Sequence, residues 1–141
     1  MKKILIISGI LTILLGGLLV YLFIFGQASR YTNIEDELKN YGYIVQKVQE
    51  VLPSIKGPND NFVNHKTYLI NGYQKVSLYE YSSYFSAKGD LLNLSGPMVD
   101  WEALPHFFWR SKFLIIYLGN DKNLINDLEK ILGKEYISKY K

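Results

Sequence analysis

The chain contains no cysteine, and this absence removes several functions at once. It excludes disulfide bonds, thiol nucleophiles, cysteine-ligated metals and a lipid-modified cysteine as a membrane anchor. Any folded domain must therefore be stable without disulfides, which is feasible because a chain of this length buries enough apolar surface.

Histidine is scarce and the common catalytic motifs are missing. The two histidines, His65 and His106, are 41 positions apart. The sequence has no G-x-S-x-G, no Walker-type glycine loop and no H-E-x-x-H. A lone histidine such as His65 within a predicted strand is more typical of a hydrogen-bonded side chain than of a metal ligand. We therefore predict that the protein is not an enzyme and has no cofactor and no metal site.

Excess positive charge is confined to the first thirty residues. Lys2, Lys3 and Arg30 are three of the 16 Lys and Arg residues, and the remaining 13 balance 13 Asp and Glu residues. Residues 31–141 are therefore formally neutral. Since no basic block is left to attract phosphates, nucleic acid is not an expected partner.

A long apolar run is the first feature that the sequence does contain. Ile4 to Phe25 is 22 residues without a charge. A helix with a rise of about 1.5 Å per residue would span roughly 33 Å, enough to cross a hydrocarbon core of about 30 Å. Residues 1–30 are therefore predicted to be an N-terminal transmembrane anchor.

The charges that flank this run predict its direction. Lys2 and Lys3 precede it, and positive flanks usually stay in the cytoplasm, so residues 31–141 are predicted to be extracytoplasmic on a single-pass protein of the cell membrane. The alternative is a signal peptide, because Gly26-Gln27-Ala28 fits a cleavage site and cutting near Ala28 would secrete the rest. A run of this length is longer than the 7 to 15 residues, roughly, of a signal-peptide core, and this favours the anchor.

Residues 31–141 are predicted to form one small α+β domain. Alternating apolar residues, turn residues and caps predict a mainly antiparallel sheet of about five strands with two or three helices. The predicted strands are 43–52, 62–70, 73–81, 105–110 and 112–119, and the predicted helices are 33–41, 84–88 and the segment from Asn120 or Asp121 to Gly133.

Local signals sharpen this scheme. Thr32 and Glu35 have capping-box spacing, and Asn71-Gly72 is typical of a tight hairpin. Alternation predicts that strand 73–81 is half-buried, whereas segment 113–118 is apolar on both faces and is expected to be central. Gly89 is expected to end the short helix, with a loop over residues 90–104.

Part of the chain resembles a known group of proteins. The segments that carry the resemblance are Tyr79-Glu80-Tyr81, Asp100-Trp101, Pro105-His106-Phe107-Phe108 and Ile115-Ile116-Tyr117-Leu118-Gly119-Asn120-Asp121, followed by an amphipathic helix ending at Leu132-Gly133-Lys134. Residues 75–135 resemble small exported or lipid-anchored proteins of Gram-positive bacteria that have no assigned activity. The resemblance implies tethering outside the membrane, here by a transmembrane segment, and supplies no catalytic residue.

One polar cluster could carry chemistry. Asp100, Glu102 and His106 lie within seven residues of one another and could position a proton acceptor or bind a metal, as in an envelope hydrolase or metal-dependent enzyme. The alternative, which is favoured, is that Asp100 stabilises a turn and His106 bonds a backbone carbonyl. A small immunity or stress protein is a third alternative, which size and topology allow.

Aromatic residues provide the leading functional hypothesis. Exposed rings bind sugars or apolar peptides with little loss of entropy. We therefore predict a noncatalytic binding or accessory domain at the cell envelope, with a glycan, peptide or protein partner. The candidate binding residues are Tyr79, Tyr81, Tyr84, Trp101, Phe107 and Trp109. The alternative is that most of them belong to the core, because strand alternation puts Phe107 and Trp109 on one face.

Overall fold

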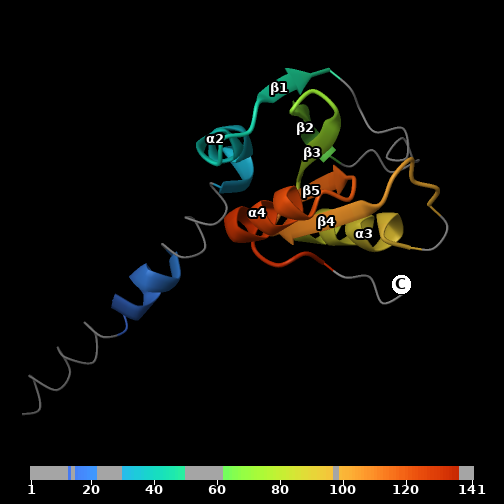
Figure 1. Ribbon diagram of the computed structural model, residues 1–141. Coiled ribbons are helices and arrows are strands. Elements are labelled where there is room, and N and C mark those ends of the chain that lie inside the picture. The colour runs from blue at the N-terminus through green and yellow to red at the C-terminus, as the bar shows by residue number, and fades with distance from the viewer. Residues whose placement is uncertain (1–12, 14, 22–29, 50–61, 97–98, 137–141) are drawn as a thin grey trace, which may run out of the picture.

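A computed structural model of the chain describes residues 13, 15–21, 30–49, 62–96 and 99–136 (Figure 1). The domain is α+β, as predicted, and is built on a five-stranded antiparallel sheet in the order β1-β2-β3-β5-β4. The strands are β1 (Val45–Val48), β2 (Phe62–Ile70), β3 (Gln74–Tyr81), β4 (Pro105–Arg110) and β5 (Phe113–Leu118). The helices are α2 (Ile34–Asn40), α3 (Tyr84–Leu94) and α4 (Lys122–Leu132), and residues 15–21 and 30–32 are also helical.

Helices cover both faces of the sheet. Ile34 and Leu38 of α2 pack on one face together with Leu124, Leu128 and other apolar residues of α4. On the other face, Ala87, Leu91 and Leu94 of α3 pack against β3, β4 and β5. We call these two apolar layers the α2/α4 core and the α3 core. Figure 1 shows α4 and α3 with strands of the sheet between them.

The central position of β3 corrects one prediction. Val76 and Leu78 point into the α2/α4 core as expected, but Tyr79 and Tyr81 are fully buried in the α3 core on the opposite face. β3 is therefore covered on both sides rather than half-buried. β5, which is apolar throughout, is buried along its whole length as predicted.

The structure also corrects the predictions for the end of α3 and for the cap of α2. α3 continues past Gly89 and ends at Leu94, so residues 90–94 are helical. The N-cap of α2 is Asn33 and not Thr32, and the Asn33 side chain makes no capping hydrogen bond.

The hairpin turn differs from the prediction only in its length. Asn71 and Gly72 adopt φ values of 53° and 84°, as the sequence predicts for a tight hairpin. Ile70 pairs with Gln74, so three residues form the loop.

The predicted anchor lies largely outside the described residues. Residues 1–12, 14 and 22–29 are not described, nor is the predicted turn within residues 50–61. Residues 15–21 are helical with exposed side chains. In the described part of the chain, no helix has both the length and the apolar character that crossing a membrane requires. The transmembrane anchor stays a prediction.

Candidate functional site: an exposed aromatic patch

Four of the six candidate aromatic residues are structural. Tyr79, Tyr81 and Phe107 are buried in the α3 core. Trp101 packs edge-on against Phe107 with ring centroids 5.8 Å apart, and its indole N–H donates a hydrogen bond to the carbonyl oxygen of Leu94 at 3.2 Å. These side chains join α3 to the sheet and do not offer their faces to a ligand.

Tyr84 and Trp109 come together at the surface. Tyr84 is the first residue of α3 and Trp109 lies near the end of β4, and their ring centroids are 5.0 Å apart. Phe85 stands edge-on to Tyr84 at 5.4 Å. Phe85 is 81% exposed, although phenylalanine is among the residue types most often buried, and Tyr84 is 43% exposed. We call Tyr84, Phe85 and Trp109 the aromatic patch.

Hydrogen bonds hold the patch in place. The Ser83 hydroxyl caps α3 by accepting a hydrogen bond from the amide of Ser86 at 3.1 Å, and this fixes the helical turn that carries Tyr84 and Phe85. The Trp109 indole N–H donates to the carbonyl oxygen of Ser111 at 3.1 Å within the β4–β5 turn. Two rings on a capped helix and one on a strand therefore form a preorganised surface.

The position of Phe85 could be inferred from the sequence only after the length of α3 is known. The buried residues Ala87, Leu91 and Leu94 follow the i, i+4, i+7 spacing of one helix face. Phe85 lies off that face. The predicted helix ended before Gly89 and therefore did not include Leu91 and Leu94, which define the buried face. Phe85 was not among the predicted site residues.

A lysine lies beside the patch. The ammonium group of Lys88 is 5.9 Å from the centroid of the Tyr84 ring, within the range of a cation–π interaction. Lys88 itself is exposed. The patch therefore combines apolar ring faces with a nearby positive charge.

The structure separates His106 from Asp100 and Glu102. Asp100 and Glu102 are exposed, whereas His106 is only 6% exposed. Its Nε2 lies 3.0 Å from the carbonyl oxygen of Gly119, and its Nδ1 lies 3.1 Å from a carboxylate oxygen of Glu135. The bond of His106 to a backbone carbonyl agrees with the favoured prediction, whereas its contact with Glu135, 29 residues further along the chain, was not predicted.

This geometry gives no support to an enzyme centred on His106. The imidazole ring stacks on Tyr117 at 5.6 Å, its Nε2 is hydrogen-bonded to Gly119, and its Nδ1 is buried beside the Glu135 carboxylate. Within the ranges that the structure describes, no group of three His, Cys, Asp or Glu side chains could hold a metal ion.

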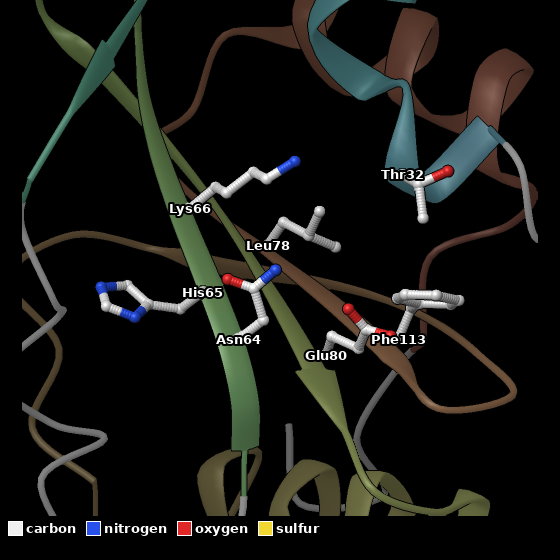
Figure 2. Close-up of a pocket in the computed structure, with 7 residues that line it drawn as sticks. All are labelled: Thr32, Asn64, His65, Lys66, Leu78, Glu80 and Phe113. Atoms are coloured by element: carbon white, nitrogen blue, oxygen red, sulfur yellow. The ribbon is translucent and has the colours of Figure 1, made fainter.

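A small polar cavity lies elsewhere, beside β2 and β3. Its volume is about 20 Å³, which is enough for roughly one water molecule. Figure 2 shows the side chains of Asn64, Glu80 and Phe113 on one side of the β2 ribbon, while the His65 ring points away from them on the other side. The Glu80 carboxylate is 2.7 Å from the ammonium group of Lys112. This cavity is too small for an organic substrate.

The fold and the site together define a small α+β domain with helices on both faces of an antiparallel sheet and an exposed aromatic patch at one end of α3. Comparison of the chain with protein-family models, curated proteins and solved structures found no match in any of the three. The resemblance of residues 75–135 to exported Gram-positive proteins stays a prediction.

Proposed function

We propose that this protein is a noncatalytic binding or accessory domain of the cell envelope, tethered outside the membrane by residues 1–30. The aromatic patch of Tyr84, Phe85 and Trp109 is its binding surface. The exposure of Phe85 in contact with Tyr84, which in turn contacts Trp109, is the observation that carries the proposal. The uncharged run from Ile4 to Phe25 supports the tether.

The patch has the properties of a recognition surface. Burying three neighbouring rings against a ligand removes a large apolar area from water, and few rotatable bonds are frozen in the process. Exposed apolar side chains that touch one another are a stronger sign of binding than the same residues scattered singly. Ring faces suit sugars, apolar peptides and the interfacial part of lipids.

The surroundings of His106 support the noncatalytic part of the proposal. A general base must reach a substrate proton, and His106 is buried between Gly119, Glu135 and Tyr117. Asp100 and Glu102 are exposed and do not contact it in the described part of the chain.

Site-specific photo-crosslinking in the native membrane tests the proposal. We would replace Phe85 with p-benzoylphenylalanine and compare it with the same replacement at Tyr73, which is 72% exposed in the turn between β2 and β3. We expect a reproducible adduct at position 85 and not at position 73. No adduct at position 85, or the same adducts at both positions, would contradict the proposal.

A further inference from the structure

We infer that the aromatic patch binds the surface of the membrane that holds the anchor. This inference rests on the proposed function and names the ligand of the same site: the interfacial region of a phospholipid bilayer. Three observations carry it, namely the place where the chain enters the domain, the length of chain between the predicted span and that point, and the side chains beside the patch.

The chain enters the domain at the end of the sheet that carries the patch. Tyr31 is buried, stacks on Phe113 with ring centroids 6.2 Å apart, and donates a hydrogen bond to the carbonyl oxygen of Leu132 at 3.3 Å. Phe113 pairs with Arg110, the residue after Trp109. In Figure 1 the arrowhead of β4 and the end of α4 lie on the side of the domain nearest the start of α2.

The short connection to the predicted span keeps this end of the domain near the membrane. Five residues, 26–30, separate Phe25 from Tyr31. Whatever its conformation, a chain that takes six Cα–Cα steps from Phe25 to Tyr31 spans at most roughly 21 Å. If the span ends at the membrane surface, Tyr31 must lie within that distance of it, and Phe113, whose ring stacks on Tyr31, lies at the same end of the domain.

The chemistry of the patch suits the bilayer interface. Tryptophan and tyrosine are enriched there because each combines an apolar ring with a polar group, and Phe85 adds a fully apolar side chain that can enter the acyl boundary. Lys88, on the same helix, places a positive charge beside the rings, where it can approach lipid phosphates.

The distribution of charge around this end defines how the domain faces the membrane. The acids Glu35, Asp36 and Glu37 lie in the first turn of α2, across the sheet from α3. Asp90, the acid of α3, interacts with buried Tyr81. We therefore expect the α3 side to tilt toward the bilayer and the α2 side to tilt away.

The position of the patch distinguishes a lipid surface from other ligands. A glycan or peptide could be bound equally well by a patch at any place on the domain. A patch at the same end of the sheet as the chain entry is kept near the bilayer by the tether, so binding loses little translational entropy.

Quenching of tryptophan fluorescence by brominated lipids tests this inference on the full chain. The protein would be reconstituted into vesicles of phosphatidylcholine and phosphatidylglycerol brominated high on the acyl chain. Trp101→Phe leaves Trp109 as the emitting residue, and Trp109→Phe leaves Trp101, which lies beside Leu94 at the other end of α3. We expect Trp109 to be quenched severalfold more strongly than Trp101.

A second substitution shows whether the patch itself makes the contact. In the Trp101→Phe background, Phe85→Ser should lower the quenching of Trp109, whereas Tyr73→Ser should leave it unchanged. Phe85 and Tyr73 are both highly exposed, so neither change should unfold the domain.

The outcomes separate this inference from the proposed tether. If the protein floats with the vesicles but Trp109 and Trp101 are quenched equally, the inference is wrong and the tether stands. If the protein does not float with the vesicles, the tether is wrong and the inference falls with it. Adducts of a protein or glycan instead of lipid at position 85 would also overturn the inference.

Discussion

The hydroxyl of Tyr117 lies directly against the backbone of Gly119. A Cβ atom added at residue 119 would overlap the Tyr117 hydroxyl and lie 2.6 Å from its ring carbon Cζ. The same hydroxyl accepts a hydrogen bond from the amide of Asp121 at 3.1 Å, which fixes the ring in this position. Glycine is therefore required here for space.

Gly119→Ala should destabilise the domain by about 1–3 kcal/mol because it overpacks a fixed ring. Gly89→Ala is the matched control. Gly89 lies inside α3 with nothing within 4 Å of an added Cβ, so alanine there should stabilise by about 0.5–1 kcal/mol through its helix propensity. Urea unfolding of both variants measures the difference. If Gly119→Ala and the unmodified protein have the same urea midpoint, the Tyr117 ring can move aside without cost and glycine is not required at residue 119.

Asp121 should make stability depend on pH in the acid range. A hydrogen bond from Gln74 and bonds from the amides of Leu124 and Asn123 lower the pKa of its carboxyl below the ordinary value of 3.8. A carboxyl whose pKa is lower in the folded than in the unfolded protein stabilises the fold when it is ionised. This stabilisation is fully present at pH values above the pKa of the unfolded state. That stability is lost as the pH falls through the lower folded value.

Asp121→Asn tests this linkage. Asparagine can still cap α4, but it lacks the second acceptor oxygen and the charge, so the variant should be less stable at neutral pH by about 1 kcal/mol. As the pH falls below 3.8, the difference between the two proteins should shrink, which urea unfolding at a series of pH values measures. A difference that stays constant with pH would exclude the carboxylate as its source.

At the scale of elements, local patterns predicted most strands and helices to within about a residue, with two exceptions. The first strand was predicted over 43–52, but β1 is only Val45–Val48 and residues 43, 44 and 49 lie outside it. The bounds of β2 and β4 agree with prediction because turn residues and proline mark both strands. α3 was predicted too short, since glycine is a weak helix former. Buried Leu91 and Leu94 hold the helix together past Gly89 through contacts with the sheet. Packing of this kind joins residues far apart in the chain, and it is not visible in any local window.

The cap of α3 supports the first turn, and therefore the patch. Ser83→Ala removes the hydroxyl that accepts from the Ser86 amide and should cost about 1 kcal/mol of stability. Ser82→Ala, one residue earlier and exposed, should change little. Urea unfolding measures both. If both serines give the same small loss, the cap contributes nothing to the stability of α3.

The segment after α4 is attached to the edge of β4. The Tyr136 amide donates to the carbonyl oxygen of Phe107 at 2.7 Å, while Glu135 contacts His106. Glu135→Ala should loosen this attachment, so the Tyr136 amide should exchange with deuterium severalfold faster. Glu102→Ala, which removes an exposed carboxylate, is the control. Unchanged exchange at Tyr136 would show that its backbone bond holds the segment alone.

At the scale of the whole molecule, the candidate site was predicted only in part. The sequence favoured an aromatic surface and named Tyr84 and Trp109, but it also named Tyr79, Tyr81 and Phe107, which are buried. Strand alternation could not separate the two groups because helices cover both faces of the sheet. Whether a ring is exposed depends on which part of each face α3 reaches.

The absence of cysteine permits one measurement that addresses both the tether and the patch. Phe85→Cys and Tyr73→Cys each introduce one thiol at a highly exposed position. Both variants would be labelled in intact cells with a maleimide that does not cross membranes, and each rate would be divided by the rate for the urea-unfolded protein.

We expect position 73 to be labelled in intact cells and position 85 to be labelled severalfold more slowly, because its surface is occupied in the membrane. Equal normalised rates at the two positions would contradict binding at the aromatic patch. Labelling of neither position until the cells are permeabilised would contradict an extracytoplasmic domain.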